Sequence, residues 1–220
     1  MVDALQHLID KGYYPNIIID VGAAKGTYPL LNKFKKSFFI WIEPLVEFEK
    51  GLKRLKKAYK GDYIIAAAGK ISGKGIINVH DDLYGSSLLK EKDGKIADGI
   101  QREINMINID SIIEKYNITE GSKVFLKLDV QGFELEVLEG AFRMLQYCEA
   151  VMLEVSFFNF QESAPDFYDI VQYMKKCGFV AYDIINGLNR PLDNALAQKD
   201  ILFVKEKGIF RQSHKFIGNP

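Results

Sequence analysis

The sequence predicts an α/β fold built on a mostly parallel sheet. Short β-branched or aromatic runs alternate with helical patterns along most of the chain. Parallel strands need crossover connections, usually helices, so this alternation predicts one sheet with helices on both faces. Several runs are apolar throughout, as expected for strands that are buried on both faces. The 220 residues are enough for one domain with a sizeable core.

Composition narrows the class of protein. The charged fraction is 26% and the formal net charge is zero, so we expect no nucleic acid or membrane surface as partner. No apolar run approaches the ~18 residues that a membrane span needs. Cys148 and Cys177 have neither metal-ligand nor disulfide spacing, and residues 1–15 read as an amphipathic helix rather than a secretory signal. We therefore expect a cytoplasmic protein.

The first half of the chain begins with a β-branched run at 17–21 that opens into a turn bracketed by Gly22 and Gly26. Glycine allows a sharp turn there and close approach of a ligand to the main chain. The basic run at 50–60 has apolar residues at helical spacing, so its lysines are expected on the solvent face of a helix. We expect strands at 17–21, 37–42, 63–67 and 76–80, the last peripheral, and helices at 27–34 and from about 45.

The second half begins with a polar, glycine-containing stretch at 81–101 that includes the Ser86-Ser87 pair. Long loops of this kind tend to be functional or disordered, so we expect a mobile, lid-like surface excursion. No helix separates the last two strands, which should therefore pair antiparallel. We expect strands at 104–109, 124–130, 150–155, 180–185 and 201–204, helices at 110–116 with Asp110 as N-cap, at 133–145 and from Asp166 to Gly178, and a loose tail at 207–220.

Four acids, Asp20, Glu43, Asp129 and Glu154, fall at or near the carboxyl ends of predicted parallel strands. Those ends share one edge of the sheet, where ligands bind in open α/β folds. Each acid alone has a structural alternative, such as bonding a turn, capping a helix, facing solvent or pairing with a lysine. Buried acids cost free energy unless they are satisfied, so their convergence predicts a functional crevice.

Glu43 follows the glycine turn by roughly twenty residues, where doubly wound folds place an acid that accepts hydrogen bonds from ribose hydroxyls. The turn from Gly22 to Gly26 lacks the middle glycine that admits a pyrophosphate, which speaks against a dinucleotide. A nucleoside without a diphosphate, such as S-adenosylmethionine, fits better, and its positive sulfonium suits an acid-rich pocket.

Taken in order, the residues match a known family. The matching segments are Ile-Ile-Ile-Asp-Val-Gly-Ala-Ala-Lys-Gly at 17–26, Ile-Glu-Pro at 42–44, Gly-Ser-Ser-Leu at 85–88, Leu-Lys-Leu-Asp-Val-Gln-Gly-Phe-Glu-Leu-Glu-Val-Leu-Glu-Gly-Ala at 126–141, Glu154, and Asp-Ile-Leu-Phe-Val at 200–204. Over nearly its whole length the chain resembles the FkbM-type methyltransferases, which depend on S-adenosylmethionine and mostly O-methylate sugars and secondary metabolites. The resemblance implies a Rossmann-like class I methyltransferase sandwich, with a mostly parallel seven-stranded sheet and an antiparallel last strand.

The resemblance also assigns residues to the cofactor. Asp20, Gly22 and Gly26 would hold its methionine part, and Glu43 its ribose. Alanines 66–68 would lie beside the adenine but offer no polar side chain, so backbone groups or the Ser86-Ser87 loop would read the adenine amine. The implied cofactor-binding set is Asp20, Gly22, Ala23, Gly26, Glu43, Pro44, Ala67, Ser87 and Asp129.

The expected catalytic residues are Lys127, Asp129 and Glu154. Lys127 and Asp129 lie two apart in a strand and therefore on one face. They form either a structural ion pair, in which Asp20 is another candidate partner, or a group that positions the acceptor hydroxyl together with Gln131 and Glu134. Methyl transfer to a hydroxyl needs alignment and removal of a proton, and Glu154 is the candidate base.

The partner is expected to be a saccharide or other small-molecule acceptor, recognised by residues 81–101, 157–164 and 186–198. The aromatic residues of 157–164 would either stack on the acceptor or pack the core. The sequence shows no dedicated metal-ligand cluster, so we expect no metal requirement, and a homodimer stays open. Two alternatives remain, namely a non-catalytic nucleoside-binding protein and a nicotinamide-dependent oxidoreductase.

Overall fold

A computed structural model describes residues 1–92 and 99–217. Within them, a seven-stranded sheet has the order β3-β2-β1-β7-β8-β10-β9. Neighbouring strands are parallel from β3 to β8, and β10 is antiparallel to both of its neighbours. The predicted mostly parallel sheet with an antiparallel last strand is confirmed. Its strands are β1 (Ile17–Val21), β2 (Phe38–Glu43), β3 (Gly61–Ile65), β7 (Val124–Leu128), β8 (Cys148–Ser156), β9 (Phe179–Asn189) and β10 (Leu196–Lys205).

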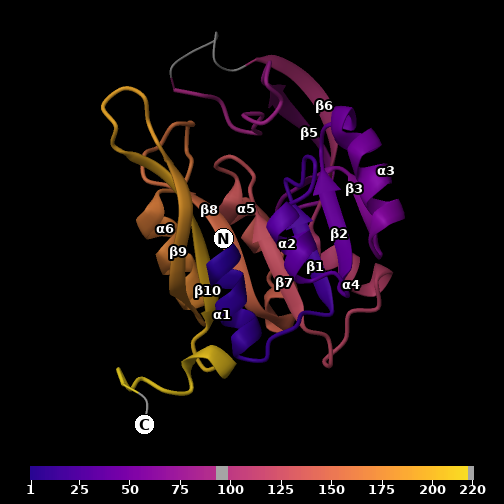
Figure 1. The fold of residues 1–220 in the computed structure, drawn as a ribbon. Helices are drawn as coiled ribbons and strands as arrows, with labels where there is room; N and C mark the ends of the chain where they lie inside the picture. Colours follow the sequence, from indigo (N-terminus) through magenta and orange to yellow (C-terminus); the bar gives the residue numbers. More distant parts are fainter. Residues whose placement is uncertain (93–98, 218–220) are drawn as a thin grey trace.

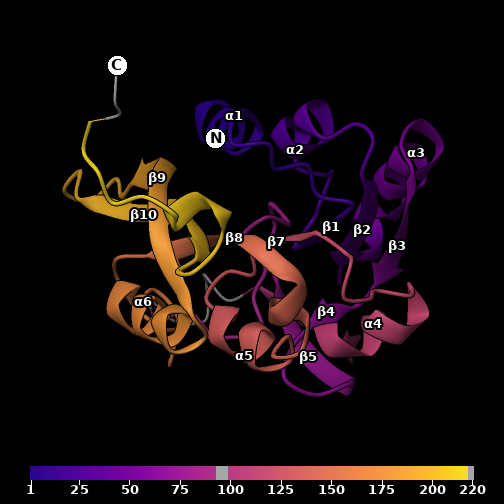
Figure 2. The same cartoon turned by 90° about the horizontal axis from the view of Figure 1, so that it is seen from below.

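Helices cover both faces of this sheet (Figure 1 and Figure 2). One face carries α1 (Val2–Asp10), α2 (Tyr28–Lys33) and α3 (Glu49–Ala58), and the other carries α4 (Ile112–Lys115), α5 (Glu134–Glu139) and α6 (Phe167–Lys176). Because side chains alternate across a strand, Ile18 packs into the core below α1–α3, whereas Ile17 and Ile19 pack into the core below α4–α6. None of the described helices is both long and apolar enough to cross a membrane.

A second, three-stranded sheet has the order β4-β6-β5 and consists of β4 (Ala67–Ala68), β5 (Gly73–Val79) and β6 (Ile100–Ile107). The strand predicted at 63–67 is therefore wrong in its limits, because β3 ends at Ile65 and Ala67 pairs with β6. The excursion predicted at 81–101 is too long, since Ile100 and Gln101 pair with β5. The first four residues of β6 are exposed or half-buried, which explains why they resemble a loop. The strand predicted at 104–109 is the second half of β6, which ends at Ile107.

Two helix predictions need correction. Asp110 does not cap its own helix, because its carboxylate accepts from the backbone N–H groups of Arg143 and Met144. The side chain of Asn108 instead caps a short 3₁₀ helix, η2 (Ile109–Ser111), which precedes α4. The helix expected over 133–145 ends with α5 at Glu139, and a second 3₁₀ helix, η3 (Met144–Tyr147), follows.

The ends of α6 match the prediction. Asp166 caps the helix through a capping box with Asp169, and Gly178 has a φ of +82°, which glycine adopts readily. The tail predicted as loose begins in an ordered way, because the 3₁₀ helix η4 (Ile209–Arg211) buries Phe210 against Tyr13. A further 3₁₀ helix, η1 (Val46–Phe48), leads into α3.

Candidate functional site

A cavity of about 650 Å³ lies at the carboxyl edge of the main sheet. This volume is in the range of small-molecule sites, and the position is where open α/β folds bind ligands. Its walls come from the β1–α2 turn, the ends of β2, β7 and β8, the alanines at 66–68, residues 83–88 and the β9–β10 hairpin. The predicted site residues among them are Gly22, Ala23, Gly26, Glu43, Pro44, Ala67, Ser87, Lys127, Asp129 and Glu154.

The glycine turn brings the ends of two strands together. Gly22 has a φ of +71°, and a Cβ at this position would overlap the main-chain carbonyl oxygen of Asp129. The turn is also tied to β2, because the N–H groups of Gly22 and Ala23 both donate to the carbonyl of Ile42. Only glycine therefore allows this close approach of β1 and β7 beside the cavity.

Asp20 lies below the turn and is not among the residues that line the cavity. Its side chain is 1% exposed, and its two oxygens accept from the backbone N–H and the hydroxyl of Thr27, both at 3.0 Å. Burial raises the pKa of Asp20, and nearby Lys127 opposes that rise. The carboxylate thus holds the turn in place rather than facing the cavity, which is the turn-bonding alternative for this acid.

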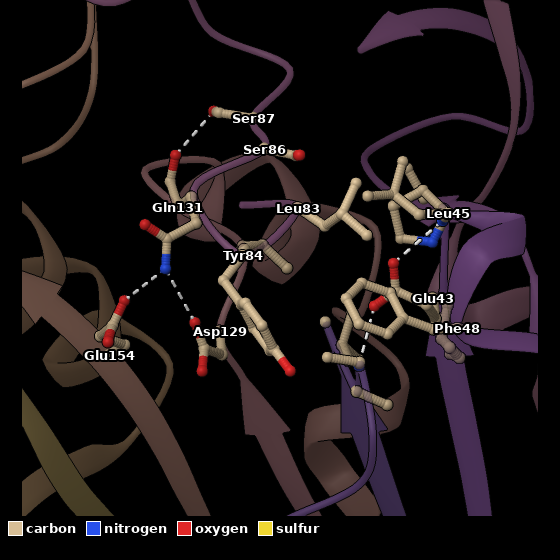
Figure 3. A pocket seen from close by; sticks show the side chains of 18 of the residues that line it. Glu43, Leu45, Phe48, Leu83, Tyr84, Ser86, Ser87, Asp129, Gln131 and Glu154 are labelled. Atoms are coloured by element: carbon tan, nitrogen blue, oxygen red, sulfur yellow. Dashed lines mark hydrogen bonds between the residues drawn. The ribbon is translucent and has the colours of Figure 1, made fainter. Parts of the chain in front are cut away.

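Glu43 lies at the tip of β2 and faces the cavity (Figure 3). One carboxylate oxygen accepts from the Ala24 N–H at 2.8 Å, and the other accepts from the Leu45 N–H at 2.9 Å. Burial raises its pKa to about 7, although both amide donors act in the opposite direction. Glu43 therefore joins the first turn to the second strand and keeps a carboxylate on the cavity wall.

The wall next to Glu43 is apolar, with Ala66, Ala67, Ala68, Leu45, Phe48 and Ile77. The hydroxyl of Ser87 lies on this wall but donates to the carbonyl of Gln131 at 2.7 Å, and it accepts from the Leu89 N–H. The Ser86 hydroxyl accepts from the His80 N–H. The Ser87 hydroxyl thus both donates and accepts within the protein, whereas the Ser86 hydroxyl only accepts.

Lys127 and two carboxylates form a buried charged group. The Lys127 Nζ lies 3.1 Å from Asp129 Oδ2 and 3.9 Å from Asp20 Oδ1, and its side chain is only 5% exposed. Burial alone would lower the pKa of Lys127, but the two carboxylates outweigh it and raise the pKa above its ordinary value. Lys127 therefore stays protonated and cannot serve as a base, so its contacts match the structural ion pair.

Glu154 is held by two amides near the end of β8. Its Oε2 accepts from Gln131 Nε2 at 2.8 Å and from Gln198 Nε2 at 3.2 Å. Burial raises the pKa of Glu154 to about 8, and the charges of Asp129 and Asp200 act in the same direction. A carboxyl group with this pKa is suited to general-base chemistry near neutral pH.

Other predicted contributors are arranged differently. Glu134 does not line the cavity, because its side chain is buried and accepts from the Gly132 N–H. None of the residues 157–164 lines it either: Phe157 stacks on Phe167. Residues 186–198 contribute Leu188 and Gln198. Within residues 1–92 and 99–217, no group of three or more His, Cys, Asp or Glu side chains is arranged to hold a metal ion.

Tyr84 is a wall residue that the sequence pattern did not single out. It belongs to the predicted excursion, and its ring lies 5.4 Å from that of Phe48, with the Lys25 ammonium 5.3 Å from its centroid. Because Lys25 belongs to the glycine turn, this contact places Tyr84 against that turn. Figure 3 shows Leu83 and Tyr84 between Gln131 and Phe48, and Ser87 beside Gln131. Residues 93–98 of the same excursion lie outside the described residues.

The family follows from the sequence match. Residues 20–181, well over half of the chain, match the family described as the methyltransferase FkbM domain. This segment holds the glycine turn, Glu43, the Lys127–Asp129 strand and Glu154. The chain therefore belongs to the FkbM methyltransferase family. No curated protein matches it significantly.

Comparison with solved structures finds methyltransferases at low sequence identity. Magnesium protoporphyrin IX methyltransferase from Synechocystis PCC 6803, solved with bound S-adenosylmethionine, has a TM-score of 0.50 and 10% identity, covering 93% of this chain and 77% of that one. Precorrin-6y C5,15-methyltransferase from Geobacter metallireducens GS-15 has a TM-score of 0.47 and 9% identity, covering 92% of this chain and 88% of that one. 1,6-Didemethyltoxoflavin-N1-methyltransferase from Burkholderia thailandensis has a TM-score of 0.47 and 8% identity, covering 92% of this chain and 76% of that one. The first of these shares the class I methyltransferase fold with this chain.

Proposed function

We propose that the protein transfers a methyl group from S-adenosylmethionine to a hydroxyl of a saccharide or another small-molecule acceptor. The observation that carries this proposal is one cavity with two chemically different ends. Glu43, the glycine turn and an apolar wall form one end, and Asp129, Gln131 and Glu154 form the other. A cofactor and an acceptor that must react with each other need such a shared space.

The residues at the first end fit an adenosyl sulfonium compound. Glu43 offers a carboxylate for the ribose hydroxyls, and the alanine wall offers a flat apolar surface for the base. The turn from Gly22 to Gly26 brings main-chain groups to the cavity for the amino-acid part. Asp129 would place negative charge near the sulfonium. In this assignment Asp20 acts through the turn, and Ala23, Pro44, Ala67 and Ser87 complete the wall.

At the second end Glu154 is the proposed base. Bound S-adenosylmethionine supplies an electrophilic methyl group on a positively charged sulfur. Both amide donors to Glu154 reach Oε2, which leaves Oε1 without a hydrogen-bond donor among the described residues. Oε1 would take the proton of the acceptor hydroxyl while the hydroxyl oxygen gains the methyl group and S-adenosylhomocysteine leaves. Lys127 would hold the Asp129 side chain in place through their ion pair.

The test is an acceptor panel of monosaccharides, nucleotide sugars and phenolic or aliphatic alcohols, incubated with S-adenosylmethionine. We expect S-adenosylhomocysteine to form together with a product that has gained one methylene in mass, on oxygen. A methylated nitrogen or carbon would contradict the O-methylation proposal. Binding of the cofactor without turnover of any acceptor would favour the non-catalytic alternative, and binding of NADH instead would favour the oxidoreductase.

A further inference from the structure

Gln131 has an unusual main-chain conformation for a residue other than glycine. Its φ is +51°, and Gly132 after it has a φ of +94°. Positive φ is uncommon for residues other than glycine, asparagine and aspartate, and it persists only where surrounding contacts enforce it. The turn lies just after β7, the strand that carries Lys127 and leads into Asp129, and Gln131 lines the cavity.

The side chain of Gln131 joins two acids. Its Nε2 donates to Asp129 Oδ1 at 3.0 Å and to Glu154 Oε2 at 2.8 Å, as the dashed lines in Figure 3 show. A primary amide has two N–H donors, so both are used between these carboxylates. Two carboxylates that share one amide group lie close together and repel each other when both are ionised. The N–H donors of Gln131 therefore stabilise their close arrangement.

The main chain of Gln131 is also bonded to Ser87, in the segment at 83–88. Its carbonyl accepts the Ser87 hydroxyl at 2.7 Å, and Ser87 is 4% exposed. Ser87 is in turn bonded to Asn78 of β5 by two main-chain hydrogen bonds and by the Asn78 amide. One residue therefore connects β7, β8 and the segment at 83–88 that covers the cavity.

We propose that Gln131 is a positioning residue, which fixes the carboxylates of Asp129 and Glu154 relative to each other and to residues 83–88. This inference rests on the proposed role of Glu154 as base. By holding Oε2, Gln131 directs Oε1 of Glu154 toward the acceptor. Of the other charges near Glu154, those of Asp129, Glu134 and Asp200 oppose its ionisation and that of Lys127 favours it. The amide of Gln198 donates to the same oxygen as Gln131 and also favours ionisation.

The test is Gln131→Gly, because glycine accepts the positive φ and keeps the carbonyl that Ser87 contacts while the amide is lost. We expect kcat to fall by about 10- to 100-fold, and the Kd for S-adenosylmethionine to change less than about threefold. The acidic limb of the kcat–pH profile should move to higher pH, because a carboxylate that loses a donor ionises less readily. The matched control is Asn117→Gly, an exposed position with a φ of 50°, which should leave kcat and the profile unchanged.

A second measurement does not require turnover. The carboxyl group of Glu154 is titrated by NMR in protein with ¹³C-labelled glutamate, and its signal is assigned by its loss in Glu154→Gln. We expect its pKa to be higher in Gln131→Gly than in the wild type. An unchanged titration, or an unchanged kcat–pH profile in an active enzyme, would overturn the role of Gln131. A wild type that binds no S-adenosylmethionine would refute the proposed function instead, since the titration still reports on Gln131.

Discussion

The two ends of the cavity hold their acids in different ways. At the glycine-turn end, Glu43 on the wall and Asp20 below the turn accept mainly from backbone N–H groups, such as those of Ala24 and Thr27. At the other end, Asp129 and Glu154 accept from side chains, namely Lys127 and Gln131. Backbone donors belong to the fold and stay fixed, whereas side-chain donors can be exchanged by substitution.

This difference indicates a division of labour. The first end is rigid and shaped by the main chain, as suits a cofactor of constant structure. The second end is adjustable in that substitution can exchange its donors, and in the proposed function it surrounds the acceptor. Substitutions at the second end should therefore alter turnover, and those at the first end should alter cofactor binding and stability.

The largest effect on turnover is expected for Asp129→Asn. The variant removes the negative charge next to the proposed sulfonium position and leaves the buried Lys127 ammonium with Asp20 at 3.9 Å as its carboxylate partner. We expect S-adenosylhomocysteine formation to fall by about 10³-fold, with an unchanged circular dichroism spectrum. The control is Asp3→Asn at an exposed position of α1. A variant with wild-type activity would exclude an essential role for Asp129.

Glu154→Gln should lower kcat by about 100-fold and leave the Kd for S-adenosylmethionine nearly unchanged. In the wild type the base must lose its proton, so kcat should rise with pH up to about 8, where the pKa of Glu154 lies. Without this carboxyl group that limb should disappear. Initial rates between pH 5 and pH 9 check both points, and a limb that persists in the variant would assign the base to another group.

Gly22→Ala probes the rigid end. A Cβ would overlap the Asp129 carbonyl, and alanine does not readily adopt a φ of +71°. We expect a loss of about 3 kcal/mol in the free energy of unfolding and a weaker affinity for S-adenosylmethionine. Gly51→Ala in α3 is the matched control, because a Cβ there meets no atom within 4 Å. It should stabilise the protein by about 0.5–1 kcal/mol, and equal effects of the two variants would contradict the account.

The last prediction concerns stability alone and is confined to high pH. Burial raises the pKa of Glu134 from 4.5 to about 7. Between these values the folded state binds a proton that the unfolded state has lost, so stability falls as pH rises through this window. Glu134→Gln should remove this pH-dependent loss of stability. The variant should therefore gain on the order of 3 kcal/mol in the free energy of unfolding at pH 8 and change little at pH 4. Urea unfolding at both pH values measures it, and an equal gain at both would point to packing instead.

Sequence patterns predicted the rigid end better than the adjustable one. Gly22, Glu43 and the strand that ends at Asp129 lie in local motifs whose geometry is repeated in many α/β folds, so their convergence could be foreseen. The ion pair of Lys127 and Asp129 follows from a two-residue spacing in a strand. The placement of Asp20 below the turn depends on Thr27, which no pattern in the sequence singles out.

The other features depend on contacts between distant segments. The bond between Gln131 and Glu154 spans 23 residues, and that between Gln198 and Glu154 spans 44. No local pattern encodes such pairs. Strands were predicted at 76–80 and 104–109, but their pairing in a separate sheet was not, because it joins distant segments. The first half of β6 was missed because an exposed strand has the composition of a loop.

The central claim is that the cavity binds an adenosyl sulfonium compound through Glu43 and the glycine turn. Isothermal titration calorimetry with S-adenosylmethionine tests it directly, in the wild type and in Glu43→Ala. The account predicts saturable binding of one molecule per chain, weakened at least about tenfold in the variant by loss of the proposed carboxylate–ribose hydrogen bonds. Absence of heat with both S-adenosylmethionine and S-adenosylhomocysteine, or equal affinity of the two proteins, would contradict it.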